Sequence, residues 1–283
     1  ATAAACGATD DDSTAYSVGY VSGREAAAVG CNWDFGPVCD LLYNWRNTIV
    51  NTRAYGKDPE LVIKNAKAYV RGVRESGLAV CCKHFPGDGI EELDQHLVMG
   101  VNTMECDERD STFGHVYKEM IDSGIQSIMA GHIALPEYSR KLRPGIKDED
   151  IMPATLAPEL ITDLLRGKLG FNGLVLTDAS HMAGMTAAMP RSQQVPGAIA
   201  AGCDMFLFFN DIEEDFGYMM DGYRNGIITE ERLTDALRRI LGLKASLKLH
   251  EKMKKGTLIP EKEGLSVVGC AEHLAMAAEA AKK

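Results

Sequence analysis

The sequence predicts an α/β protein with a parallel sheet covered by helices, as in a (β/α)8 barrel of the TIM type or an open doubly wound sheet. Short apolar segments typical of buried parallel strands alternate with amphipathic helical segments along the 283 residues. Polar side chains gather where the predicted strands end: Asp40, Lys83, His84, His132 and Asp178. In a barrel such ends form one face, where active sites are built. An open doubly wound sheet also binds ligands at its strand ends, and only roughly six strands are evident from the pattern.

The first half of the chain predicts two helices and two strands. Residues 1–14 are small and polar and are expected to be irregular, and a helix is expected over 16–30 with Asp12 or Ser13 as its cap. A strand at 31–38 leads into a loop. Asp58 and Pro59 predict the start of a helix that runs to about residue 76, because Asp suits the cap and Pro the first turn. The central strand is expected at 78–85.

The second half continues the alternation. Helices are expected at 105–124, 155–169 (with Thr155 as a cap), 193–201, 213–224 and 229–249, and strands at 125–133, 174–178 and 205–209. Residues 133–154 contain three prolines and are expected to form a long loop. We expect a charged connector at 251–264 and a last helix at 273–282. These segments place the barrel domain at 1–250 and a connector at 251–283.

The composition of the chain limits which classes of partner and which compartment are expected. Net charge is −10, which disfavours nucleic acid and anionic membranes as partners. The chain has eight cysteines without a CxxC pair, and several lie in apolar runs, so a reducing compartment without disulfides is expected. No segment has the length of a transmembrane helix. These features predict a cytoplasmic protein, although the chain starts at Ala1 rather than Met, so a removed leader and export stay open.

Residues 80–96, VCCKHFPGDGIEELDQH, form the most informative stretch. A β-prone segment delivers Lys83 and His84 to a Pro-Gly-Asp-Gly turn, and an acidic loop follows that ends in Asp94-Gln95-His96. An Asp two residues from a His can hold the ring and fix its tautomer. Such a pair can act as a general acid and base, although the spacing alone fixes little geometry and favours a solvated loop histidine.

The motif of residues 83–89 followed by Asp94-x-His96 resembles glycoside hydrolase family 3, and in particular its β-N-acetylglucosaminidase branch. The resemblance covers residues 16–283 and departs from the branch at Asp88, where relatives usually have histidine. Residues 23–40 resemble the second barrel unit of the family, so the barrel is expected to lack its first βα unit in this chain. Residues 269–283 resemble the segment that leads toward a second domain, which is absent from this chain.

The resemblance implies roles for individual residues. Asp178 matches the nucleophile of the family, and as an Asp at the end of an apolar strand it needs cationic neighbours to stay ionised. His96, oriented by Asp94, matches the acid and base. A further set is expected to bind the sugar: Asp40, Arg53, Lys83, His84 and His132. For His132 a core role is as compatible with its position as contact with sugar, and His181 is a weaker candidate near the site.

These roles imply a retaining, exo-acting enzyme that removes terminal β-linked N-acetylglucosamine, with small carbohydrates such as cell-wall or chitin fragments as partners and no cofactor. A β-glucosidase or β-xylosidase and a phosphorylase are alternatives within the family, and a non-catalytic sugar-binding fragment is an alternative outside enzymes. His84, Asp88, Asp94 and His96 could also offer metal ligands, but their spacing matches no zinc signature. No dinucleotide or phosphate-loop fingerprint is present.

Overall fold

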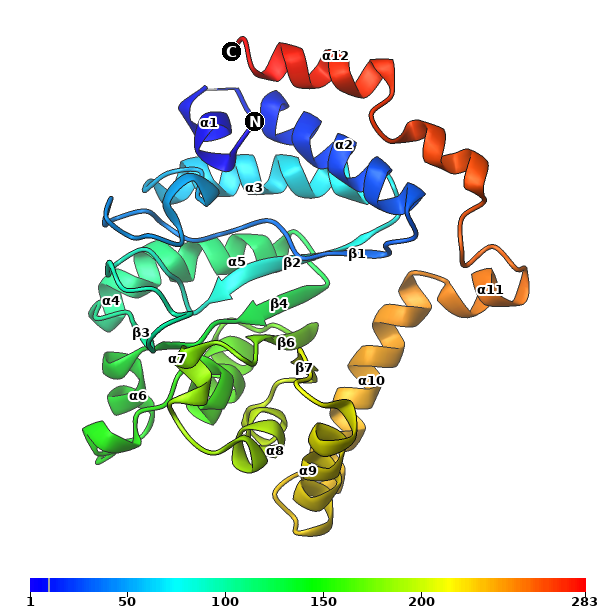
Figure 1. Cartoon of the computed structure of the whole chain (residues 1–283). Coiled ribbons are helices and arrows are strands. Elements are labelled where there is room, and N and C mark those ends of the chain that lie inside the picture. The colour runs from blue at the N-terminus through cyan, green and yellow to red at the C-terminus, as the bar shows by residue number, and fades with distance from the viewer. Residues whose placement is uncertain (10) are drawn as a thin grey trace.

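The computed structural model describes residues 1–9 and 11–283 of the chain. Its centre is a five-stranded parallel sheet that curls into part of a barrel (Figure 1). The strands lie in the order β1 (Trp33–Asp34), β2 (Ala79–Phe85), β4 (Ser127–Ala130), β6 (Leu174–Ala179) and β7 (Met205–Leu207). A second, two-stranded parallel sheet pairs β3 (Gly100–Val101) with β5 (Ile133–Ala134). The predicted α/β class and barrel-type architecture are therefore confirmed, in the form of a partial barrel.

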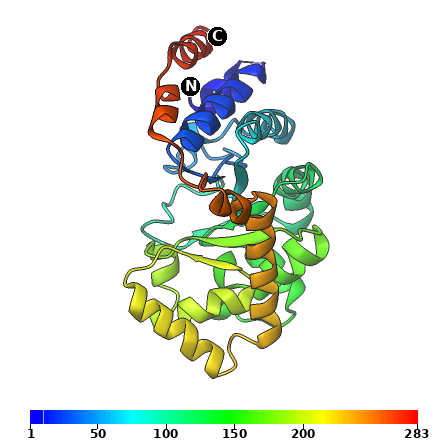
Figure 2. The ribbon, with the colours of Figure 1, turned by 90° about the vertical axis from the view of Figure 1, so that its right-hand side faces the viewer.

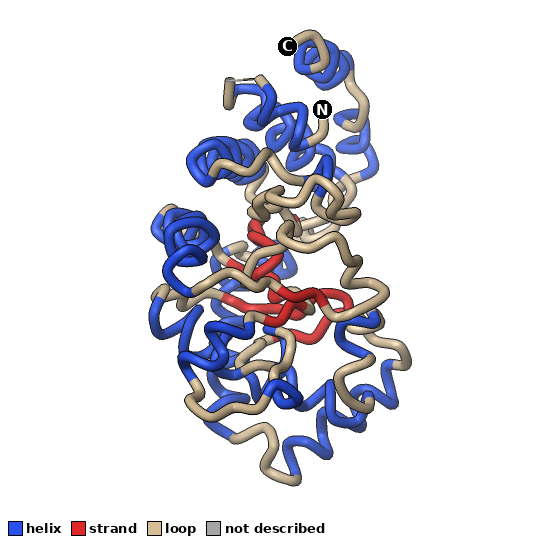
Figure 3. The backbone as a smooth tube through the Cα atoms, turned by 90° about the vertical axis from the view of Figure 1, so that its left-hand side faces the viewer, coloured by secondary structure: helices blue, strands red, loops and turns tan. Residues whose placement is uncertain are grey.

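Helices separate the five strands of the main sheet along the chain, as the alternating pattern predicts. In space they surround the strands (Figure 3). The α-helices are α1 (Ala3–Ala8), α2 (Ser13–Ala28), α3 (Pro59–Arg74), α4 (Cys106–Arg109), α5 (His115–Asp122), α6 (Pro136–Leu142), α7 (Ala183–Thr186), α8 (Arg191–Ala201), α9 (Ile212–Arg224), α10 (Glu230–Ser246), α11 (Leu249–Lys254) and α12 (Ala271–Ala280). Two π-helical segments, η2 (Asp110–Gly114) and η5 (Glu159–Lys168), and four short 3-10 turns complete the fold: η1 (Asn51–Arg53), η3 (Asp148–Asp150), η4 (Ala154–Leu156) and η6 (Lys262–Val267).

The capping chemistry explains where two of the long helices begin. The Asp58 carboxylate accepts from the Glu60 amide at 3.1 Å and Pro59 opens α3, as predicted. The Thr229 hydroxyl accepts from the Arg232 amide at 3.1 Å at the start of α10. In each case the side-chain oxygen satisfies an amide that the first helical turn leaves without a partner.

Three local expectations are wrong. Residues 1–14 are not irregular, because α1 and the first residues of α2 lie there, and the Asp12 side chain makes no capping bond. Residues 133–154 are not a continuous loop, because Pro136 sits in the first turn of α6, a position that suits proline. Thr155 caps no helix: its hydroxyl bonds to a histidine ring, and the following helix begins beyond Pro158.

The sheet has apolar side chains on both faces. Val80, Cys82 and Ile128 belong to the main core, which they form with side chains of α3, α5 and η5 (Figure 1). Cys81 and Met129 belong to a smaller cluster that Ile240 and Leu243 of α10 pack against. Adjacent Cys81 and Cys82 thus point to opposite faces, as the strand period predicts. Buried side chains on both faces agree with a parallel sheet.

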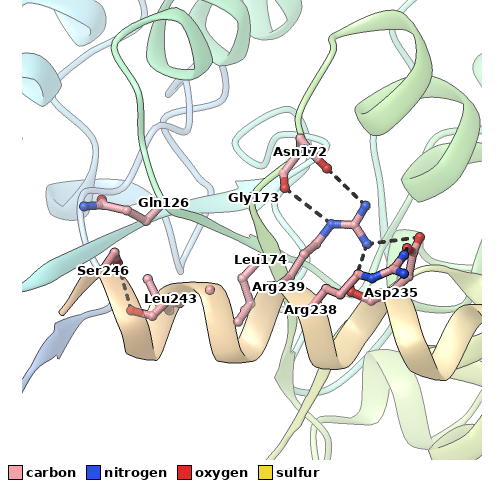
Figure 4. Close-up of a pocket in the computed structure, with 10 residues that line it drawn as sticks. Gln126, Asn172, Gly173, Leu174, Asp235, Arg238, Arg239, Leu243 and Ser246 are labelled. Atoms are coloured by element: carbon pink, nitrogen blue, oxygen red, sulfur yellow. Dashed lines mark hydrogen bonds and ion pairs between the residues drawn. The ribbon is translucent and has the colours of Figure 1, made fainter. Parts of the chain in front are cut away.

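Helix α10 crosses the amino ends of the strands (Figure 2). Between this helix and the starts of β4 and β6 lies a cavity of about 520 Å³, in which Arg239 donates to Asn172 and pairs with Asp235 at 3.5 Å (Figure 4). Its lining includes none of the residues predicted for catalysis or sugar binding. At this end of a barrel, well-bonded side chains contribute to stability rather than to chemistry.

The buried carboxylate of Asp204 connects several elements at the amino end of the sheet. Asp204, at the start of β7, pairs with Arg166 at 2.8 Å, with Arg239 at 3.6 Å and with Arg232. It also accepts from the Val175 amide at 2.9 Å. Asp204 therefore connects η5, β6 and α10.

The carboxyl-terminal segment returns to the amino-terminal helices (Figure 1). The buried ring of His273 in α12 bonds to Glu25 of α2 at 2.8 Å, and Lys283 pairs with Asp11 at 2.7 Å. The connector expected at 251–264 is partly helical, because α11 and η6 overlap it. That this segment leads toward a second domain stays a prediction. Within the described residues, no helix combines the length and apolar character needed to cross a bilayer.

Candidate active site

Asp40, His84 and Asp178 meet at the carboxyl end of the sheet, where His84 lies at the end of β2 and Asp178 at the end of β6. The His84 ring bonds through Nδ1 to Asp40 Oδ2 at 2.7 Å, and its backbone amide donates to Asp40 Oδ1 at 3.1 Å. Because an ionised carboxylate only accepts, Nδ1 carries the proton, and Nε2 faces Asp178 Oδ2 at 3.8 Å. Both partners of this bond are buried, with His84 only 4% exposed and Asp40 fully enclosed. The strand-end residues that the sequence selects thus form one rigid group.

The Asp178 carboxyl is held ionised by its surroundings. Burial would raise its pKa, but His84, His132, the amide of Ala179 and Lys83 together lower the pKa below its ordinary value. The Ala179 amide donates to Asp178 Oδ1 at 2.7 Å. Fifteen per cent of the side chain is exposed, so Asp178 is partly accessible. An ionised, partly accessible carboxylate at a strand end has the properties of a nucleophile.

Lys83 and Arg53 lie beside this group. Arg53 Nη2 lies 3.5 Å from His84 Nε2, and both cations line a cavity of about 270 Å³ that also includes Asp34. Adjacent residues of a regular strand point to opposite faces. Here the β2–β4 ladder shifts register between Cys82 and Phe85, so the alternation is broken where Lys83 and His84 occur. Both side chains can reach one ligand only where a strand departs from this alternation.

Asp94 and His96 form the predicted pair. His96 Nδ1 lies 2.7 Å from Asp94 Oδ1, which also accepts from the His96 amide at 2.8 Å. Half of the His96 side chain is exposed, and Asp94 is a quarter exposed. The bond places the proton on Nδ1 and leaves Nε2 free to exchange a proton with a ligand.

The loop that carries this pair is attached to the segment that follows Asp178. The amides of Ala183 and Gly184, at the start of α7, donate to the carbonyls of His96 and Gln95 at 2.9 and 3.0 Å. A β-carbon at Gly184 would lie 2.8 Å from the Gln95 carbonyl oxygen, so only glycine allows this approach. The candidate nucleophile and the candidate acid are therefore on segments bonded to each other.

His132 is placed behind the site rather than open to it. It is fully buried, and its ring bonds through Nδ1 to Thr155 Oγ1 and through Nε2 to the Ala179 carbonyl, both at 2.9 Å. Burial lowers the pKa of this ring, although Asp178 opposes the shift. Both ring nitrogens have partners, so the geometry favours a supporting role next to Asp178. Sugar contact by His132 stays a prediction.

Two buried polar residues around the site were not selected from the sequence. Asp88, where the resemblance implies a histidine, accepts from Asn47 at 2.9 Å and from Gln95 at 3.0 Å. Gln95, only 2% exposed, also accepts from the amide of His132 at 3.1 Å. Burial and the charge of Asp40 raise the pKa of Asp88. A glutamine between two catalytic candidates gives no sequence signal for burial, and only its contacts reveal it.

A metal site has no support in the geometry. In the part of the chain that the structure describes, no three His, Cys, Asp or Glu side chains are grouped as metal ligands. His84 and Asp88 are instead bound into the buried network, while Asp94 and His96 pair with each other at the surface.

Comparison with known proteins identifies the family of this chain. The family description "Glycosyl hydrolase family 3 N terminal domain" matches residues 2–243. A protein of Cellulomonas fimi named "Beta-N-acetylglucosaminidase/beta-glucosidase" is 51% identical over 278 residues, which is 98% of this chain and 48% of that protein. A "Beta-hexosaminidase" of Chromobacterium violaceum is 36% identical over 71% of this chain and 53% of its own length. The chain thus spans about half the length of the curated relatives it matches.

Two solved structures are similar to this chain over most of its length. "Beta-glucoside phosphorylase BglX" superposes with a TM-score of 0.96 and 42% identity over 99% of this chain and 50% of that one. A β-N-acetylglucosaminidase from Paenibacillus gives a TM-score of 0.80 and 28% identity, over 93% of this chain and 50% of its own. The match over most of the chain means that this chain belongs to glycosyl hydrolase family 3.

Proposed function

We propose that this chain carries the catalytic site of a retaining, exo-acting glycosidase that releases terminal β-linked N-acetylglucosamine. The observation that supports this most strongly is that two different chemical groups lie on segments bonded to each other, through the amides of Ala183 and Gly184. Asp178 is a carboxylate whose neighbours lower its pKa. Asp94–His96 is a pair whose free ring nitrogen can give and take a proton.

The reaction has two steps. Asp178 Oδ2 attacks the anomeric carbon, the glycosidic C–O bond breaks, and the leaving oxygen takes the proton of His96 Nε2. The product is a covalent glycosyl ester of Asp178. In the second step His96 Nε2 removes a proton from water, the water oxygen attacks the anomeric carbon, and the carboxylate is released. Two displacements at one carbon retain its configuration.

His84, Lys83 and Arg53 are proposed to hold the hydroxyl groups of the terminal sugar, with Asp40 acting through His84. Asp40 uses both oxygens within the protein, so it acts by orienting His84. Lys83 and Arg53 lie at the mouth of the neighbouring cavity and are only partly buried or exposed, so their donors are open to a ligand.

Phosphate instead of water is the second candidate acceptor. A neutral histidine base repels an incoming anion less than a carboxylate base would. This chain is also similar, with a TM-score of 0.96, to a protein named "Beta-glucoside phosphorylase". In that reaction the phosphate oxygen attacks the glycosyl-Asp178 ester and yields a sugar 1-phosphate.

Turnover of p-nitrophenyl β-N-acetylglucosaminide against the β-glucoside tests the proposal, with and without phosphate. Preference for the acetamido sugar, lost in Asp178→Ala and His96→Ala, supports it, and turnover that requires phosphate selects phosphorolysis. Preference for the glucoside with His96→Ala unaffected would reject the Asp–His mechanism. Calorimetric binding of sugar without any turnover would identify a non-catalytic sugar-binding chain.

A further inference from the structure

We infer that Gln95 is a positioning residue, which clamps the Asp94–His96 loop to the sugar-binding group through Asp88. The inference rests on the proposed function. Gln95 stands between the two members of the pair in sequence, yet its side chain is directed away from them into the protein and is 2% exposed. It is the only residue of the Asp94–His96 segment that is fully buried.

The orientation of the Gln95 amide follows from its partners. Oε1 receives the backbone N–H of His132 at 3.1 Å, a group that only donates. Nε2 must therefore face Asp88 Oδ2, which lies at 3.0 Å. The Asp88 side chain is fixed in the same way, because Asn47 Nδ2 donates to its other oxygen at 2.9 Å while Asn47 Oδ1 accepts two backbone amides.

These bonds form a route between the functional groups. Asp88 donates its backbone amide to Asp40 at 2.9 Å, and Asp40 holds His84. At the other end, His132 bonds to the Ala179 carbonyl next to Asp178. Gln95 thus links the residues beside the sugar, the residue behind the nucleophile and the loop with the acid. Without these bonds the position of the proton donor would depend on the exposed loop alone, in which His96 is itself half-exposed.

Reversing the direction of one hydrogen bond tests this role. In Gln95→Glu the carboxylate faces that of Asp88 without a donor between them, and in Asp88→Asn two N–H donors face each other. In the double variant the new amide at position 88 donates to the new carboxylate at position 95, while the carbonyl oxygen at position 88 still accepts from Asn47 and Gly89. The double variant thus restores the clamp with opposite polarity, and Gln193→Glu, on an exposed position of α8, is the charge-matched control.

Two aglycones separate positioning from general damage. Phenol is a poor leaving group that needs the His96 proton, whereas 2,4-dinitrophenol leaves without one. We expect Gln95→Glu to lower kcat/KM about 100-fold for the phenyl glycoside and less than about 5-fold for the dinitrophenyl glycoside. The double variant should recover to within about 5-fold of the wild type on the phenyl glycoside, and Gln193→Glu should match the wild type. Equal losses on both aglycones, or no recovery in the double variant, would overturn the inference.

Hydrogen exchange gives a readout that does not need turnover. The amides of Ala183 and Gly184 donate to the loop carbonyls, so a released loop should exchange them at least about 10-fold faster in Gln95→Glu, with protection restored in the double variant. Unchanged exchange would refute the clamp. If the wild-type chain turns over neither glycoside, the proposed function fails, and this exchange comparison still decides whether Gln95 holds the loop.

Discussion

Replacing Gly184 with alanine places a methyl group against the loop that carries the Asp94–His96 pair. The new Cβ would lie 2.8 Å from the Gln95 carbonyl oxygen, 2.9 Å from the His132 β-carbon and 3.2 Å from the Val98 carbonyl oxygen. Ordinary contact begins near 3.4 Å, so the loop must move by about 0.6 Å or the helix must retreat. His132 is fully buried and held at both ring nitrogens, so we expect the exposed loop to be the part that moves.

The expected cost has a structural and a catalytic part. Overpacking at one buried contact costs about 1–3 kcal/mol of unfolding free energy. A displacement of this size at a proton donor lowers turnover about 10- to 100-fold, since roughly 1 Å of misplacement can cost 100-fold. Urea unfolding gives the first quantity. Turnover of the phenyl and dinitrophenyl glycosides gives the second, with the larger loss expected for the phenyl glycoside.

Gly217→Ala is the matched control. Gly217 also lies within a helix, α9, and its β-carbon would meet nothing within 4 Å. Alanine there should raise stability by about 0.5–1 kcal/mol without changing kcat/KM. A Gly184→Ala variant that unfolds and turns over like the wild type would refute the argument that this approach fixes the loop.

Three further outcomes follow from the buried charges. Asp40→Asn should lower the unfolding free energy by about 2–3 kcal/mol and raise KM, because His84 and the Asp88 amide lose a charged acceptor. Denaturant titration measures the first effect and sugar-dependent kinetics the second, and no change in either would contradict the prediction. Asp204→Asn should lower the unfolding free energy, measured in urea, by about 3–5 kcal/mol, because three arginines lose their shared carboxylate. The KM of the folded protein should stay unchanged, because Asp204 lies at the opposite end of the strands from the site. Burial would raise the pKa of Asp215, but Arg191 and the Asn210 amide hold it below its ordinary value. Its stabilisation is therefore present above about pH 4 and lost as pH falls through the lower folded pKa, so Asp215→Asn should flatten the decline of Tm between pH 6 and pH 3, and equal slopes in both proteins would contradict this.

The sequence predicts the parts of the fold that depend on local chemistry. The start of α3 follows from Asp58 and Pro59, and the opposite faces of Cys81 and Cys82 follow from the strand period. Thr155 shows the limit of that reasoning. Its hydroxyl can cap a helix or bond to a ring, and the buried His132, 23 residues away, is the partner that it takes.

The candidate site also has residues that the sequence could predict and one that it could not. Asp178, His84 and Asp40 could be selected because strand ends converge in a barrel, and the structure brings these three together. The role of Gln95 could not be predicted, because it depends on Asp88, on the amide of His132 and on an approach of α7 that requires Gly184. Each of these contacts joins different turns of the chain, and sequence spacing does not encode them.

Strand β2 carries a thiol into each of the two apolar layers that the sheet separates. Cys81 and Cys82 are both buried, and burial raises the pKa of Cys81 to about 12, so neither reacts while the layers are closed. Cys82 becomes accessible to an alkylating reagent when the layer beneath α3 and α5 opens, and Cys81 when α10 lifts away. The order in which these neighbouring residues are modified during mild denaturation therefore records which side of the sheet comes apart first.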